Sequence, residues 1–226
     1  MQKQASAPGI RISAEDPIIL FIGDLEDTRS QALPEWQAAH PHTPVFNLKS
    51  WKVEVSFRVL DDGTPENIPD LLRQIVQTAN SQSPFGFRVD GDNDKFSTFV
   101  PIQTRNAAGD VVQKTALLDL HVDIASGERT IAEHGQMLAD VLSAKSGIRV
   151  YCCQSFGVGV PWGRAKTIFA AQDLPARWVL EQLIELDENA TTVGPRYHWL
   201  LNCQPNTNRG TDQCFINLTQ VRGGGC

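Results

Sequence analysis

The sequence predicts an α+β fold built from two small layers in which helices lie on a mixed sheet. Three observations lead to this class: strand-like alternation of apolar and polar residues, helical segments with recognisable starts, and the order of these segments along the chain. From Leu117 to Thr219 that order reads strand, helix, strand, strand, helix, strand, strand. We therefore expect an N-terminal α+β unit at residues 10–105, a second unit at residues 106–219 and a flexible tail at residues 220–226.

In the first unit, residues 51–59 have the period of a half-buried strand. The side chains expected to face the core there are Val53, Val55, Phe57 and Val59. Thr64 and Pro65 suit the cap and first position of a helix whose apolar stripe runs from Ile68 to Ala79. Further strands are expected at Ile10–Ser13, Ile18–Ile22, Phe85–Val89 and Phe96–Ile102, and an interrupted helix within Leu25–His40.

In the second unit, Thr130 and Glu133 form the pattern of a capping box, and Gly147 suits the left-handed residue that ends the same helix. A second helix is expected at Leu174–Asp187, with Asp173 as its cap. The strands predicted around these helices are Leu118–Ile124, Ile148–Cys152, Lys166–Ala170 and a closing hairpin.

The composition predicts a soluble globular protein without a nucleic-acid partner. The chain has 226 residues, 41% hydrophobic residues and a formal net charge of -6, with scattered acidic residues, whereas a nucleic-acid-binding surface would need clustered Lys and Arg. The longest apolar run, Ile18 to Ile22, is far shorter than the roughly 20 residues that span a bilayer, so no transmembrane segment is expected. No cofactor is expected, and the composition does not fix the oligomeric state.

Three polar residues on one predicted strand form the candidate metal site. Asp119, His121 and Asp123 alternate with apolar residues and would project from the same face. Two carboxylates beside an imidazole could bind a metal or act as a general base, although a strand with one wet face also places polar residues there. The first interpretation would make the chain a metal-dependent hydrolase; the second assigns these residues no chemistry.

Trp162 is the candidate contact for a partner or ligand. It lies among Gly157, Gly159 and Gly163 in a loop that a strand follows, which does not match the helix N-terminus that a phosphate-binding loop requires.

The closing hairpin contains the disulfide candidate. If Cys203 pairs with Cys214, antiparallel register also sets Leu201 opposite Ile216 and Trp199 opposite Leu218, all on one face. A reduced apolar pair is the alternative, and the roles of Cys152, Cys153 and Cys226 stay open. The pairing favours an exported protein whose signal peptide is missing from this sequence.

The second unit resembles the secretin and TonB N-terminal short domain. The resemblance rests on four segments: Leu118–Val122, Leu138–Val150, Pro175–Leu183 and Tyr197–Leu201. The connection Gln154–Ala165 is longer than in that family. The whole chain is also similar to exported bacterial proteins of unassigned function in which such a domain follows a related unit. The resemblance implies a periplasmic or secreted protein that docks a protein partner in the cell envelope, and it supplies no catalytic residues.

We therefore predict a non-enzymatic interaction module. The alternatives are the metal-dependent hydrolase described above and a protein that binds a small ligand or glycan through exposed tryptophans.

Overall fold

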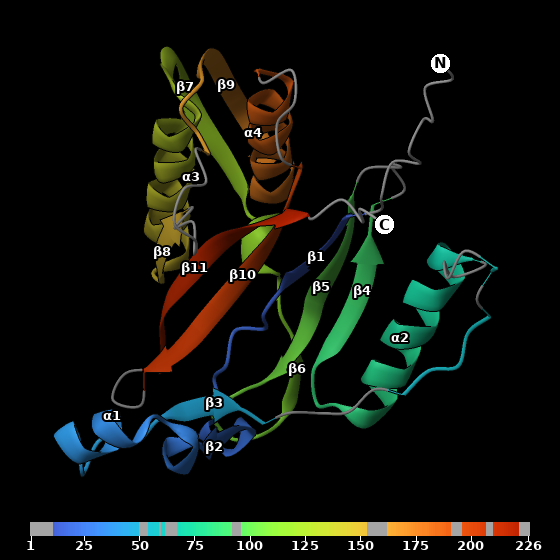
Figure 1. Ribbon diagram of the computed structural model, residues 1–226, viewed down its shortest axis with the longest axis vertical. Helices are drawn as coiled ribbons and strands as arrows, with labels where there is room; N and C mark the ends of the chain where they lie inside the picture. The colour runs from blue at the N-terminus through green and yellow to red at the C-terminus, as the bar shows by residue number, and fades with distance from the viewer. Residues whose placement is uncertain are drawn as a thin grey trace.

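The computed structural model describes residues 11–49, 54–58, 60–61, 67–91, 96–152, 162–190, 196–206 and 210–221. It confirms an α+β fold in which helices lie on a mixed sheet (Figure 1). The described strands are β1 (Arg11–Glu15), β2 (Leu25–Asp27), β3 (Phe46–Leu48), β4 (Gly86–Asp90), β5 (Phe96–Arg105), β6 (Val111–Gln113), β7 (His121–Thr130), β8 (Arg149–Cys152), β9 (Lys166–Pro175), β10 (Arg196–Asn206) and β11 (Gly210–Val221). The described helices are α1 (Pro34–Ala39), α2 (Ile68–Gln82), α3 (Ile131–Ser146) and α4 (Ala176–Ala190), with 3-10 turns η1 (Ile22–Asp24), η2 (Arg29–Gln31) and η3 (Leu117–Asp119).

The main sheet runs through both predicted units. Its strand order is β4-β5-β1-β10-β11-β8, and β6 pairs with β5. β1 is parallel to both of its neighbours, with Ala14 opposite Phe99 of β5 and Leu200 of β10. β1 therefore joins the strands of the two units into one sheet, and the independence of the units stays a prediction.

The second unit has the predicted order: β7, α3, β8, β9, α4, β10, β11. Thr130 and Glu133 form the capping box of α3, and Gly147 ends that helix with φ 72°. β7 and β9 do not enter the main sheet. They pair with each other as a separate two-stranded sheet beside α3 and α4, called here the β7–β9 ribbon (Figure 1).

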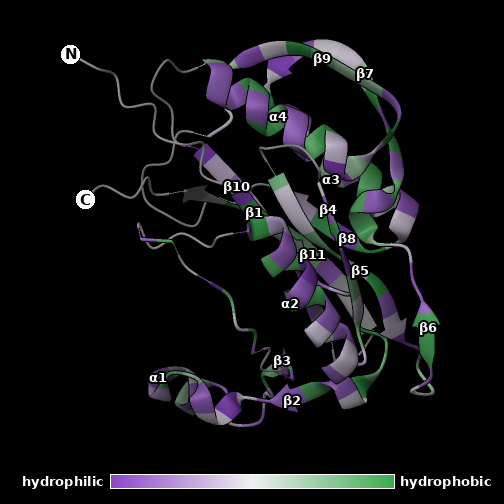
Figure 2. Cartoon of the chain, turned by 90° about the vertical axis from the view of Figure 1, so that its right-hand side faces the viewer, coloured by the Kyte–Doolittle hydropathy of each residue, from purple (hydrophilic) through white to green (hydrophobic). Residues whose placement is uncertain are grey.

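The hydrophobic core lies between the main sheet and the helices α3 and α4. Figure 2 shows that α4 carries both hydrophobic and hydrophilic residues, as a helix lying on a sheet at the surface must. The largest fully buried apolar side chains of the core include Leu138, Leu142, Leu180, Leu183, Leu201 and Trp199.

The first unit differs most from the prediction. Residues 54–58 have no regular structure and Phe57 is half exposed, while the rest of the predicted strand lies outside the described residues. Asn67 caps α2 by accepting from the Asp70 N–H, and the predicted cap Thr64 is outside the described residues. Ile18 and Ile19 are buried without forming a strand, and the Ile18 carbonyl accepts from the Thr104 hydroxyl at 2.8 Å.

Two details also differ in the second unit. Leu118 and Asp119 form the 3-10 turn η3, closed by a bond from the Leu120 N–H to the Leu117 carbonyl, so the strand begins only at His121. Asp173 belongs to β9 at a register shift with φ 49°, so it does not cap α4.

Side chains from helices cover the backbone at both outer strands of the described main sheet. The Asn80 side chain accepts from the Phe87 N–H at 2.7 Å and donates to the Phe87 carbonyl at 2.9 Å on β4. The Ser143 hydroxyl likewise accepts from the Val150 N–H at 2.8 Å and lies 3.4 Å from the Val150 carbonyl on β8. These contacts take the place of a further strand.

Candidate functional site

The inward face of β1 is polar, which is unusual for a strand in the middle of a sheet. Arg11, Ser13 and Glu15 are buried, whereas Ile12 on the opposite face is 44% exposed. β1 is therefore held beneath α4 by polar contacts more than by apolar burial. The strongest of these contacts form a cluster around Arg177 at the start of α4.

Arg177 contacts three carboxylates from three different elements. Its Nη2 lies 2.8 Å from Asp119 of η3 and 3.4 Å from Glu15 of β1, and its Nη1 lies 2.9 Å from Asp90 of β4. Because Arg177 is only 8% exposed, its charge requires such partners.

Arg88 closes the cluster on the solvent side. Its Nη2 lies 2.7 Å from Asp90 and 2.9 Å from Asp119, so these two carboxylates are shared between two arginines. In total, Glu15, Arg88, Asp90, Asp119 and Arg177 form one network, called here the charge cluster, which ties β1, β4, η3 and α4 together.

Glu15 is the most buried carboxylate of the charge cluster, at 2% exposed. Burial raises its pKa to about 7, against the opposing effect of Arg177. Its Oε1 also accepts from the Leu118 N–H at 3.2 Å. The cavity that reaches Glu15 has a volume of about 10 Å³, enough for about one water molecule.

A second set of polar contacts holds the other end of β1. Arg11 Nη1 lies 2.5 Å from Glu188 near the end of α4 and also donates to the Tyr197 carbonyl at 3.2 Å. Glu181 lies between the two sets. Burial raises its pKa to about 7, and Arg177 opposes this shift. Contacts between arginine and glutamate thus link β1 and α4 at both ends of the strand.

The structure separates the three candidate metal ligands. Asp119 belongs to the charge cluster, whereas His121 and Asp123 lie at the exposed start of β7. His121 Nδ1 lies 3.0 Å from Asp173 Oδ1, and Asp123 Oδ1 accepts from the Asp173 N–H at 2.9 Å. Within the described ranges, no three His, Cys, Asp or Glu side chains are grouped as a metal ion would require.

Trp162 is buried. It is 8% exposed and belongs to the core, with its indole Nε1 buried and without a hydrogen-bond partner in the part of the chain that the structure describes. Its neighbour Gly163 approaches α3 closely, since a Cβ there would lie 2.7 Å from the Ala132 backbone nitrogen.

The disulfide between Cys203 and Cys214 is present, which confirms the predicted pairing. The predicted register is also present: Leu201 lies opposite Ile216, and Trp199 opposite Leu218. Cys152 is disulfide-bonded as well.

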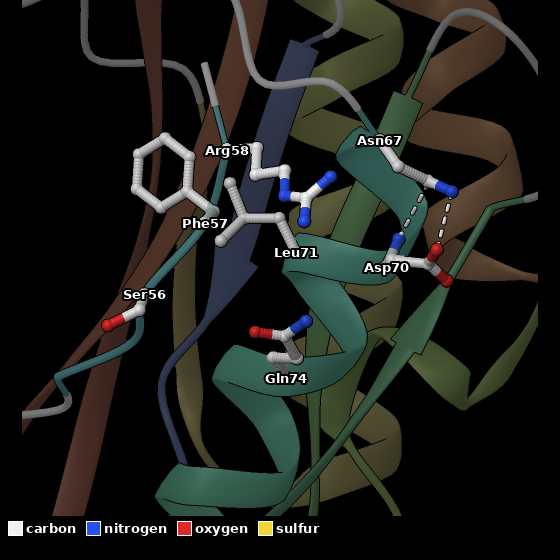
Figure 3. Close-up of a pocket in the computed structure, with 7 residues that line it drawn as sticks. All are labelled: Ser56, Phe57, Arg58, Asn67, Asp70, Leu71 and Gln74. Atoms are coloured by element: carbon white, nitrogen blue, oxygen red, sulfur yellow. Dashed lines mark hydrogen bonds between the residues drawn. The ribbon is translucent and has the colours of Figure 1, made fainter.

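An open hollow of about 370 Å³ lies between residues 56–58 and the first turns of α2 (Figure 3). Phe57 and Leu71 supply apolar surface, and the Arg58 guanidinium extends toward α2. Asn67 and Asp70 on the helix side bind each other, so they already have partners. Among the described residues that line the hollow, none is a buried polar group.

Comparison with known proteins gives no match to the chain among family models, curated proteins or solved structures. The resemblance to the secretin and TonB N-terminal short domain therefore stays a prediction.

Sequence reasoning missed the charge cluster, although part of its pattern was visible. Arg11, Ser13 and Glu15 alternate with apolar residues, and this pattern alone does not show that the polar side is buried. The spacing of Arg177 and Glu181 on one helical face was a further indication. The partners lie up to 162 residues apart, beyond the reach of any local pattern.

Proposed function

We propose that the chain is a non-enzymatic protein-binding module of the cell envelope, and that its partner docks on the outer face of the β7–β9 ribbon. The observation that carries this proposal is Ile168, which is 74% exposed in β9. Exposed apolar side chains within a polar rim are typical of the centre of protein interfaces.

The geometry of the ribbon supports the choice of this face. Phe169 points inward, where its ring meets the His134 ring edge-on at 5.6 Å, so Ile168 points outward by the alternation of a strand. Across the ribbon Ile168 faces Glu128, and further along lie the charged or polar side chains of His121 and Asp173. The outer strands β4 and β8 of the main sheet already have backbone partners from α2 and α3.

Two findings bear on the compartment. The Cys203–Cys214 disulfide supports an oxidising environment, because disulfides are rare in the cytosol. Separately, no helix in the described ranges is both long and apolar enough to cross a membrane.

Site-specific photo-crosslinking in the native cell envelope tests the docking surface. A photoreactive residue replacing Ile168 should give a defined crosslinked species, and the same residue replacing Val111 of β6, 55% exposed, is the matched control. The partner's affinity for Ile168→Glu should fall at least tenfold. Crosslinks at Val111 but not at Ile168, or an unchanged affinity, would refute the proposed surface.

A further inference from the structure

We propose that the contact between β1 and α4 is a pH-operated switch: loss of protons from Glu15 and Glu181 loosens β1 and so uncouples the two halves of the sheet that it joins. This inference is independent of the docking function. It rests on the charges buried between the strand and the helix.

The charge cluster is balanced only when Glu15 carries a proton, and Glu181, beside the cluster, adds a further negative charge when it ionises. The positive charges of Arg88 and Arg177 are matched by Asp90 and Asp119, which both arginines contact. Ionised Glu15 and Glu181 therefore leave an excess of two negative charges. Around Glu15, which is 2% exposed, such an excess is screened less than it would be at the surface.

The other charged groups around β1 do not correct this imbalance. Arg11 pairs with Glu188, and its effect in favour of an ionised Glu181 is smaller than the opposing effect of burial. Glu185 lies next to Glu181 on α4 and opposes its ionisation. Asp16 accepts from the Cys203 N–H, and burial raises its pKa as well. When it ionises, Asp16 adds a further negative charge.

Backbone pairing with β5 and β10 still holds β1 when the charges repel, but its side chains add little to that hold. The side chains on its inward face are Arg11, Ser13 and Glu15, and its Ile12 is 44% exposed, so apolar burial contributes less than in an ordinary central strand. The raised pKa values of Glu15 and Glu181, both about 7 because of burial, place the transition near neutral pH. β1 is therefore held firmly at acidic pH and loosened at basic pH.

Amide hydrogen exchange of the full chain at pH 5.5 and pH 8.5 tests the switch. After correction for the intrinsic exchange rates, protection of the Arg11–Glu15 amides should fall at least tenfold from the lower to the higher pH. Amides of the β10–β11 hairpin that do not pair with β1 should lose less protection than the β1 amides. In Glu15→Gln/Glu181→Gln the β1 amides should stay protected at both pH values.

Two further variants keep the test decisive. Glu181→Gln alone should show an intermediate loss of protection, which serves if the double variant does not fold. Glu35→Gln, at an exposed position of α1, should behave like the wild type. Equal protection of wild-type β1 at both pH values, or the same loss in Glu181→Gln as in the wild type, would overturn the proposal.

Discussion

Asp119 illustrates how one carboxylate can suit two opposite interpretations. On a regular strand it would point the same way as His121 and Asp123, but the η3 turn directs it to Arg88 and Arg177. Both of its oxygens then have guanidinium partners. The local sequence shows the residue type but not the turn that determines its direction.

Replacing Asp119 tests its structural role against the hydrolase alternative. Asp119→Ala should lower the free energy of unfolding by about 2 kcal/mol, because the buried Arg177 and the half-exposed Arg88 lose a shared partner. His121→Ala, at a 53% exposed side chain, should change it by less than about 0.5 kcal/mol. Urea unfolding gives both values.

The metal content of the same proteins, measured by mass spectrometry, separates the two interpretations. We expect the wild type and both variants to contain the same background amount of metal. Stoichiometric metal in the wild type that is lost in either variant would favour the hydrolase.

At the scale of elements, the second unit was predictable because its signals are local. The capping box at Thr130 and Glu133, the glycine at Gly147 and the paired cysteines each depend on residues close in sequence. The separate β7–β9 ribbon was not predictable, since which strands pair depends on distant contacts. In the first unit, residues 54–58 have a strand pattern but no pairing strand among the described residues, and pairing decides the structure.

The capped edge of β4 provides a prediction at this scale. Asn80→Ala leaves the Phe87 N–H and carbonyl without their partner, so stability should fall by about 1 to 2 kcal/mol and self-association should increase. Gln77→Ala, at an exposed position of the same helix, is the control.

Urea unfolding and sedimentation velocity measure the two effects of Asn80→Ala. A variant that stays as stable and as monodisperse as Gln77→Ala would show that the edge does not depend on this side chain.

At the scale of the whole molecule, β1 determines how the two halves meet. A strand of five residues lies between β5, more than 80 residues later, and β10, more than 180 residues later. Such long-range parallel pairing cannot be inferred from the period of one segment. Arg11 and Glu15 of the same strand contact Glu188 and Arg177 of α4. The strand that joins the two halves of the sheet therefore also carries the charged contacts to this helix.

The pH dependence of global stability follows from the charge cluster with a definite sign. The pKa of Glu15 is about 7 in the folded chain and about 4.5 when unfolded, so the unfolded chain loses this proton first. Stability therefore falls as pH rises from about 4.5 to about 7, and the loss is complete above that range. For the fully buried Glu15 this loss of stability is on the order of 3 kcal/mol, and the less buried Glu181 adds a smaller loss.

The most direct test is the free energy of unfolding in urea at pH 5.5 and pH 8.0, for the wild type and for Glu15→Gln/Glu181→Gln. The double variant removes the two glutamates while other titrating groups stay. We predict that the wild type loses about 2 kcal/mol or more between these pH values and that most of this loss disappears in the variant. Wild-type stability that is equal or higher at pH 8.0, or a variant with the same loss, would contradict the account.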